Sequence, residues 1–302
     1  MHLSTKILRN QIKILKPIIT NCSIEMSRSA QDKLGKIMMA GKQKELNYSY
    51  MLFSNFEAAF IRLKEINSSG VILYLHGGGY VAGDLNYAKG FGSLLAAESG
   101  IDVFCPAYRL APENPFPAAL EDAEEAYCYL LKRGYPPGSI ALAGESAGGG
   151  LIFSLALKVK QRGIPLPACI TAISPWSDLT QHGASYETNS KEDPSMTKER
   201  LDFFAKQYIP ESEDPANPLA SPVYGDLNGL PPSRLYVGGS EVMLDDAVNL
   251  YNRLIDSGCE ASLSICPGMW HAYILYGTED GKDDFNEMIN FIKEKTDEHT
   301  SK

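Results

Sequence analysis

The sequence has no uninterrupted apolar run of the roughly 18 residues that a membrane-spanning helix needs. Its first positions, from Lys6 to Lys16, alternate charged and apolar residues and lack the apolar core and small-residue cleavage site of a signal peptide. The six cysteines form no C-x-x-C pair, and most lie in apolar runs, as free thiols do in a reducing compartment. We therefore expect a cytoplasmic protein with no stable membrane insertion.

Positive charge is scarce: 28 Lys and Arg residues stand against 37 Asp and Glu residues, for a net charge of −9. Such an acidic chain is poorly suited to nucleic acid or an anionic membrane as its main partner. Neither phosphate-binding spacing, G-x-G-x-x-G or G-x-x-x-x-G-K-[ST], is present, and no residues have metal-ligand spacing. We therefore expect no metal and no cofactor.

After about residue 57, short apolar runs alternate with helical patterns, which favours a mostly parallel sheet with helices on both faces. The expected strands are Ala58–Ile66, Val71–Leu75, Asp102–Ala107, Ile140–Ala143, Ala168–Ser174, Arg234–Gly238 and Ala261–Cys266. The expected helices between and after them are Ala88–Ser99, Ala118–Leu131, Leu151–Arg162, Asp246–Ser257 and Phe285–Glu294. The 302 residues therefore predict one α/β domain rather than two independent domains.

Two segments interrupt this alternation and predict a helical cap. Residues 1–48 have helical patterns and no strand pattern, and residues 178–222 are helical, loop-rich and punctuated by proline, with a helix over Met196–Tyr208. We expect these segments to form the two parts of the cap, over a catalytic domain of residues 49–177 and 223–302. A membrane-surface helix is the alternative for the first segment, because it has basic and apolar faces.

The pentapeptide Gly144-Glu145-Ser146-Ala147-Gly148 follows an apolar run and precedes a helical pattern. Strand, sharp turn and helix are the context in which a G-x-S-x-G serine becomes an exposed nucleophile. The glycines suit the tight turn, and the helix N-terminus supplies free N–H groups beside the hydroxyl. Ser146 is therefore the candidate nucleophile, although such a short pattern can also be an ordinary turn.

A second glycine motif, His76-Gly77-Gly78-Gly79, follows the predicted strand Val71–Leu75. Backbone N–H groups without side chains over them can approach a small oxygen atom closely. We expect the N–H groups of Gly78 and Gly79, with that of Ala147, to form an oxyanion hole.

The candidate base is a histidine downstream of Ser146, because a nucleophile of this type is followed by its acid and then its histidine. His299 lies in a polar tail and His182 in a predicted surface loop. His271 follows a predicted strand and the turn that begins at Pro267, and the carboxyl ends of strands are where open α/β sheets place their chemistry. We therefore favour His271.

The acid must lie between Ser146 and His271. Three carboxylates follow the predicted strand Arg234–Gly238: Glu241, Asp245 and Asp246. Glu241 is nearest the end of the strand, whereas acids at the start of a helix are explained as caps and dipole partners. We favour Glu241 over Asp245, because a carboxylate near the strand end can hold the imidazole tautomer.

Five blocks in order resemble the hormone-sensitive-lipase-like esterases (bacterial family IV) of the α/β-hydrolase fold. They are His76-Gly77-Gly78-Gly79-Tyr80 with Gly83-Asp84; Tyr108-Arg109-Leu110-Ala111-Pro112-Glu113 with Pro115-Phe116-Pro117-Ala118-Ala119; Gly144-Glu145-Ser146-Ala147-Gly148-Gly149; Ser174-Pro175-Trp176; and Pro267-Gly268-Met269-Trp270-His271. The acid block departs from the family's Asp-Pro-Leu followed by Asp, because it reads Glu241-Val242-Met243-Leu244-Asp245. Its spacing to His271 is the one the family usually shows.

The resemblance implies a serine carboxylesterase that hydrolyses small esters with short to medium acyl chains through an acyl-enzyme on Ser146. Five residues flank the catalytic blocks and are candidates for the substrate pocket, or equally for the core: Tyr80, Val81, Trp176, Met243 and Tyr273. The alternatives are a lipase or deacetylase with the same triad, or a small-molecule binding protein without catalysis. The presence of His271 argues against the last. Family members often pair through sheet edges, so a homodimer is also considered.

Overall fold

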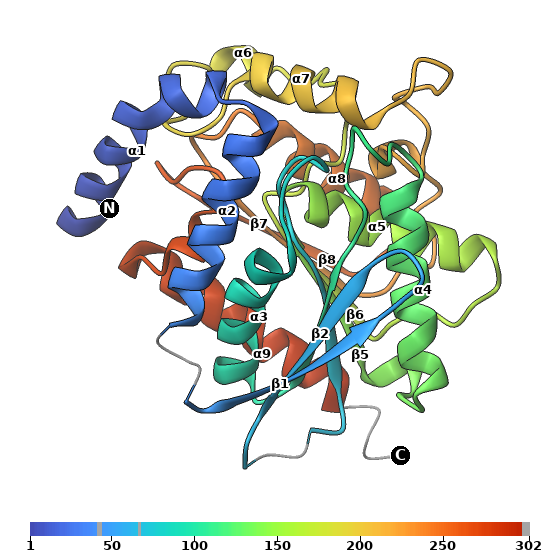
Figure 1. Cartoon of the computed structure of the whole chain (residues 1–302). Coiled ribbons are helices and arrows are strands. Elements are labelled where there is room, and N and C mark those ends of the chain that lie inside the picture. Colours follow the sequence, from blue (N-terminus) through green and yellow to red (C-terminus); the bar gives the residue numbers. More distant parts are fainter. Residues whose placement is uncertain (41–43, 66–67, 298–302) are drawn as a thin grey trace.

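The computed structural model describes residues 1–40, 44–65 and 68–297, and Figure 1 shows them arranged around one central sheet. Its strands are β1 (Leu46–Leu52), β2 (Glu57–Leu63), β3 (Val71–Leu75), β4 (Asp102–Ala107), β5 (Ile140–Glu145), β6 (Cys169–Ile173), β7 (Ser233–Gly238) and β8 (Ala261–Cys266). Their spatial order is β1-β2-β4-β3-β5-β6-β7-β8. The strand β2 runs antiparallel to both of its neighbours, β1 and β4, and all the other pairs are parallel, so the carboxyl ends of β3 to β8 meet at one edge.

Helices cover both faces of the sheet. The helices are α3 (Leu85–Ser99), α4 (Ala118–Lys132), α5 (Ala147–Gln161), α8 (Leu244–Asp256) and α9 (Lys282–Asp297). Apolar residues of α4, α5 and α8 pack in one core cluster with one face of the sheet, and those of α3 and α9 pack in a second cluster on the other face. All residues of β3, β5 and β6 are buried, as expected for parallel strands covered on both sides.

Further helices of the described residues lie beyond the sheet: in Figure 1, α6 and α7 lie across the top of the view, α1 lies at the upper left, and α2 runs down from there beside α3. They are α1 (Leu3–Asn21), α2 (Ile24–Met39), α6 (Ser185–Thr188) and α7 (Lys198–Tyr208). The side chain of Arg200 in α7 donates hydrogen bonds to the backbone oxygen of Cys22 and to Ser27 Oγ, over 2.7 Å in each case. The N-terminal helices and residues 178–222 are therefore in direct contact, although they are far apart in the sequence.

The predicted alternation of strands and helices is confirmed, with differences at its margins. The strand β1 was not predicted, and it begins at Leu46, inside the segment that was expected to be helical. The helix α5 begins at Ala147, four residues before its predicted start. Ile66, the predicted end of one strand, and His299 lie outside the described residues.

Candidate active site

Ser146 stands between the end of β5 and the start of α5, in a backbone conformation that side chains rarely adopt, with φ of 57° and ψ of −123°. A Cβ at Gly144 would lie 2.5 Å from the carbonyl oxygen of Gly148, and one at Gly148 would collide with the carbonyl oxygen of Leu75. Only glycine therefore fits at these two positions. The turn is fixed further by the N–H of Ser146, which donates to the carbonyl oxygen of Ile173 over 2.9 Å.

Glu241 and His271 are joined side chain to side chain. Nδ1 of His271 lies 2.8 Å from Oε2 of Glu241, and both residues are buried. The other carboxylate oxygen, Oε1, accepts hydrogen bonds from the N–H of Gly238 at 2.6 Å and from Ser174 Oγ at 2.8 Å. The carboxylate is thereby held in one orientation, as a group that fixes an imidazole tautomer must be.

Ser174 also links this acid to the histidine loop. Its Oγ accepts a hydrogen bond of 3.0 Å from the N–H of Ala272, the residue after His271. Ser146, Ser174 and Ala272 all have positive φ without being glycine, as do Tyr80 and Gln181. Strain of this kind persists where the surrounding structure enforces it, and it collects at functional sites.

The pKa of His271 lies above its ordinary value. Burial alone would lower the pKa, because it disfavours the charged ring. The hydrogen bond to Glu241 and the negative charges of Glu241 and Asp193 outweigh that penalty. The site thus stabilises a protonated imidazole, which is what a general base becomes after it accepts a proton.

The competing acids have other partners. Asp245 Oδ2 accepts a hydrogen bond of 2.9 Å from the N–H of Ser185 at the start of α6. Asp246 is buried, and its Oδ2 accepts from the N–H groups of Ser177 and Asp178, each over 3.1 Å. Burial holds the pKa of Asp246 well above its usual range. Among the three carboxylates, Glu241 is therefore the one that the structure places on His271.

The glycine loop after β3 presents free donors. Gly78 and Gly79 have φ values of 114° and 64°, and a Cβ on Gly79 would collide with the ring of Phe204. Within the described residues, the N–H groups of Gly78, Gly79 and Ala147 donate to no acceptor. Three unpaired backbone donors are therefore available beside the serine turn, as an oxyanion hole requires.

Glu145, the residue before Ser146, binds the glycine loop through its side chain. Its Oε1 accepts from the N–H of Gly77 at 2.6 Å and from the hydroxyl of Tyr87 at 3.1 Å, and its Oε2 accepts from the hydroxyl of Tyr74 at 2.5 Å. The carboxyl is buried, and burial raises its pKa to about 7 despite these donors. The serine turn and the glycine loop are thus tied together through one side chain.

Two other described histidines, His76 and His182, have different surroundings. His76 is buried, its ring stacks on Tyr108 with 4.2 Å between ring centroids, and burial lowers its pKa to about 4. His182 is exposed, and its Nδ1 lies 2.8 Å from Oγ1 of Thr180.

The five candidate pocket residues are all buried. Tyr80, Val81, Trp176 and Met243 belong to the core cluster with α4, α5 and α8. The ring of Tyr80 stacks on Tyr208 of α7 with 3.8 Å between centroids. Tyr273 belongs to the opposite cluster, and its hydroxyl donates to Asp284 of α9 over 2.6 Å. The structure therefore separates Tyr273 from the other four.

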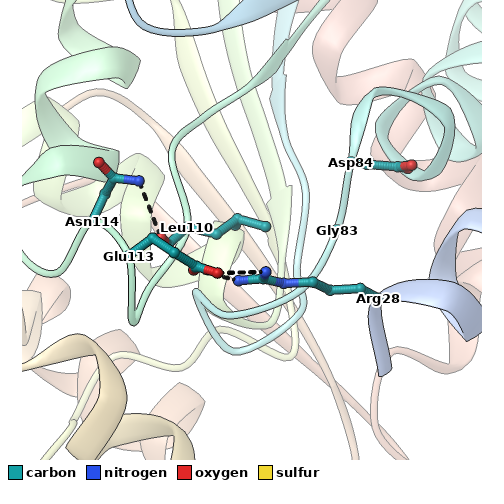
Figure 2. A pocket seen from close by; sticks show the side chains of 6 residues that line it. All are labelled: Arg28, Gly83, Asp84, Leu110, Glu113 and Asn114. Carbon is teal, nitrogen blue, oxygen red and sulfur yellow. Dashed lines mark hydrogen bonds and ion pairs between the residues drawn. The ribbon is translucent and has the colours of Figure 1, made fainter. Parts of the chain in front are cut away.

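A hollow of about 330 Å³ lies beside the glycine loop, and Arg28 of α2 crosses it (Figure 2). The Arg28 guanidinium donates to both carboxylate oxygens of Glu113, over 2.8 and 2.7 Å, and the ion pair holds the pKa of Glu113 at about 2. Arg28 also donates to the carbonyl oxygens of Val81 at 2.8 Å and Ala111 at 3.0 Å. The helix α2 is therefore anchored to the segment that follows the glycine loop.

Sequence reasoning assigned no role to Ser174, Glu145 or Asp193, although the first two lie in motif blocks. Asp193 is fully buried, and it accepts a hydrogen bond from the N–H of Val242, directly after Glu241. Ser174 follows β6, which lies beside β7, the strand that leads to Glu241. The strand order would therefore have indicated Ser174, but the sequence does not display that order. Among the described residues, no group of three or more His, Cys, Asp or Glu side chains is placed to hold a metal ion.

A family model described as alpha/beta hydrolase fold matches residues 72–275. An acetyl-hydrolase of Streptomyces hygroscopicus is 42% identical over 68% of this chain and 68% of its own length. An esterase of Acinetobacter venetianus is 31% identical over 70% of each chain. A crystal structure of an esterase from the bacterial hormone-sensitive lipase family has a TM-score of 0.88 and 34% identity, over 95% of this chain and 98% of that one.

These matches cover the strands and loops that carry the blocks from His76 to His271. The chain belongs to the α/β-hydrolase family, in the branch of the bacterial hormone-sensitive-lipase-like esterases.

Proposed function

We propose that this protein is a serine carboxylesterase that acts on small esters with short to medium acyl chains. The observation that carries the proposal is the hydrogen bond of 2.8 Å between Glu241 and His271, both buried, at the sheet edge that also carries Ser146. Relatives named esterase and acetyl-hydrolase support both the activity and a short acyl group.

In the proposed reaction, Nε2 of His271 accepts the hydroxyl proton of Ser146 while Oγ attacks the ester carbonyl carbon. Glu241 keeps the ring oriented and stabilises the imidazolium. The N–H groups of Gly78, Gly79 and Ala147 donate to the oxyanion of the tetrahedral intermediate. The imidazolium then protonates the leaving alcohol, and an acyl group remains on Ser146.

Deacylation repeats these steps with water. Water loses a proton to His271 and attacks the acyl carbon, and the same donors hold the second oxyanion. Collapse of that intermediate returns the proton to Ser146 and releases the carboxylic acid. Every group that this cycle needs is a residue of the chain, so we propose no cofactor.

We propose that the helices α1 and α2, together with residues 178–222, form a cap over this site, whereas residues 46–48 belong to β1 and therefore to the sheet. Phe204 and Tyr208 of α7 support the proposal, because the first packs against Gly79 and the second stacks on Tyr80. Four of the candidate pocket residues, Tyr80, Val81, Trp176 and Met243, then close the acyl pocket beneath α7. Bulky buried side chains at that place favour a short acyl chain.

A series of p-nitrophenyl esters of increasing acyl length tests this function. We expect kcat/KM to be highest for short chains and to fall beyond roughly eight carbons, because the proposed pocket is closed. Ser146→Ala should abolish turnover while the thermal unfolding temperature stays close to that of the wild type. Retained turnover in that variant would refute the assignment of the nucleophile, and a preference for emulsified long-chain glycerides would favour a lipase.

Location and assembly complete the proposal. No helix in the described part of the chain has the length and hydrophobicity to cross a membrane. All six cysteines are free, which supports a cytoplasmic location. We also propose a homodimer, and light scattering during gel filtration would measure its mass.

A further inference from the structure

The helix α1 presents an apolar strip to solvent. Leu3, Ile7, Ile14 and Ile18 are exposed by 74%, 51%, 76% and 60%. Their spacing places them on one side of a helix that turns about 100° per residue. In Figure 1, α1 lies at the margin of the molecule, where this side can meet a surface. Four large aliphatic side chains in one line are unusual on the surface of a soluble monomer.

The orientation of α1 is fixed by its opposite side. Arg9 donates to the carbonyl oxygens of Gly268 and Glu192, over 3.3 and 2.6 Å. Lys16 donates to the carbonyl oxygens of Ser190 and Asp193, over 2.9 and 2.6 Å. Because these two basic residues hold the helix against the body, rotation that would bury the apolar strip would break all four bonds.

The charge along α1 is of one sign. The first acidic residue of the chain is Glu25, so α1 has none. Lys6 and Lys13 border the apolar strip and are exposed, and their side chains form no ion pair or hydrogen bond within the described residues. A chain with a net charge of −9 thus places unpaired positive charge beside its exposed aliphatic residues.

The helix α2 also has exposed apolar residues beside a lysine, but fewer of them. Met26 and Ile37 of α2 are exposed by 57% and 72%, and helical spacing places Lys33 on the same side. The exposed Glu25 lies away from them on the helical wheel.

We propose that the exposed face of α1 docks on the surface of an anionic lipid bilayer. Aliphatic residues flanked by lysines are the composition of helices that lie in the membrane interface, with the lysines at the headgroups. A second copy of this chain is a poorer occupant, because it would bring the same lysines against each other. Docking here would bring the proposed cap, and therefore the ester site, to the lipid surface.

Vesicle sedimentation with the full chain tests the proposal. We expect the protein to pellet with vesicles that contain phosphatidylserine, less so in high salt, and weakly with phosphatidylcholine alone. K6Q/K13Q should lower the partition coefficient by roughly 25-fold, because each lysine near such a surface contributes about fivefold. I7S/I14S should lower it by roughly tenfold or more, since burial of each side chain in the interface is lost.

Matched variants make the result specific to α1. K132Q/K293Q removes two positive charges elsewhere, and L52S/I255S removes two exposed aliphatic side chains elsewhere, so both should pellet as the wild type does. All variants should keep their turnover of a soluble p-nitrophenyl ester, which shows that they fold and separates this test from the test of the esterase. A wild type that does not pellet, or pelleting that I7S/I14S leaves unchanged, would overturn the proposal. A dimer in gel filtration that I7S/I14S converts to monomer would assign the face to a second copy instead.

Discussion

The carboxylate of Asp193 accepts a hydrogen bond of 2.9 Å from the N–H of Val242, the residue that directly follows Glu241. Its other oxygen accepts from the N–H and Oγ of Ser195, at 2.7 and 2.9 Å. Nearby, Asn189 Nδ2 donates to the carbonyl oxygen of Glu241 over 2.9 Å. The peptide unit between Glu241 and Val242 is therefore held at both its N–H and its carbonyl oxygen by the inserted segment 178–222 rather than by the sheet alone.

This relationship predicts that Asp193 is a positioning residue. In Asp193→Asn, the amide NH₂ must face either the N–H of Val242 or the N–H groups of Ser195 and Met196, so at least one hydrogen bond is lost. We expect kcat to fall by roughly tenfold with a smaller change in KM, because buried unsatisfied donors shift the backbone that carries Glu241. The negative charge near His271 is also removed, so the pKa of the ring should fall, and the acid limb of the kcat/KM profile should move to lower pH.

Asp202→Asn is the matched control, since it removes a partly exposed carboxylate of α7 whose partner among the described residues is Lys198. It should leave the pH profile in place. If Asp193→Asn lowers the unfolding temperature but leaves the acid limb where it was, Asp193 has a structural role alone.

Substitutions of Glu241 and of Asp245 should have different effects: the first should affect catalysis and the second should affect stability. Glu241→Gln should lower kcat by roughly 10³–10⁴-fold, because the ring of His271 loses the partner that sets its tautomer. Asp245→Asn should leave kcat nearly unchanged and lower the free energy of unfolding by about 1 kcal/mol, since a bond to the start of α6 and a charge in the first turn of α8 are weakened. Steady-state kinetics and urea unfolding measure both quantities, and the reverse order would move the acid to Asp245.

Buried strands made the fold predictable. The buried strands β3 and β4 begin and end where their apolar runs predict. The edge strand β8 also has its predicted bounds, although none of its residues is fully buried. The edge strand β1 pairs antiparallel with β2 and is largely exposed, so its sequence carries no such run. The start of α5 was predicted too late because residues 148–150 are glycines, which are poor helix formers. Tertiary packing overrides that preference, since a Cβ at Gly149 would lie 2.9 Å from Pro175 and one at Gly150 would collide with Trp176.

The site was predictable to the extent that its residues lie in local motifs. Ser146, His271 and the glycine loop have spacings that a sequence displays directly. The contacts of Asp193 with Val242, and of Glu145 with Gly77, join residues 49 and 68 positions apart. No local pattern reports which buried carboxylate meets which N–H group, because that depends on how the strands are ordered.

The buried carboxyl of Glu145 predicts a pH dependence of stability. Its pKa is raised from 4.5 to about 7 in the folded chain, so the folded state binds more protons between these values. Its contribution to stability is therefore full below about pH 4.5 and is lost as pH rises through about 7, by about 3 kcal/mol in total. Urea unfolding at several pH values measures the free energy of unfolding of the wild type and of Glu145→Gln. The difference between the two proteins should fall as pH rises from about 4.5 through about 7, because glutamine does not titrate. If the free energy of unfolding depends on pH in the same way in both proteins, the pKa of Glu145 is not raised by folding.

Glu145→Gln also bears on catalysis. In the glutamine amide the carbonyl oxygen accepts hydrogen bonds and the NH₂ only donates, whereas the carboxylate of Glu145 accepts at both oxygens, so the anchor of the glycine loop is weakened. We expect kcat to fall by roughly tenfold, less than the 10²–10³ that loss of an oxyanion donor causes, because the donors are displaced rather than removed. A kcat equal to that of the wild type would show that the loop keeps its place without this bond.

Arg28 forms both an ion pair with Glu113 and hydrogen bonds to two backbone carbonyl oxygens, and we expect the second kind of contact to matter more. Glu113→Gln removes only the partly exposed charge pair, so the free energy of unfolding should fall by less than about 1 kcal/mol and kcat should not change. Arg28→Gln additionally releases the carbonyl oxygens of Val81 and Ala111, and should cost about 2 kcal/mol. Because Val81 follows the glycine loop, Arg28→Gln should also lower kcat several-fold. Equal effects of the two variants on kcat and on urea unfolding would show that the ion pair, and not the bonds to the backbone, is what anchors α2.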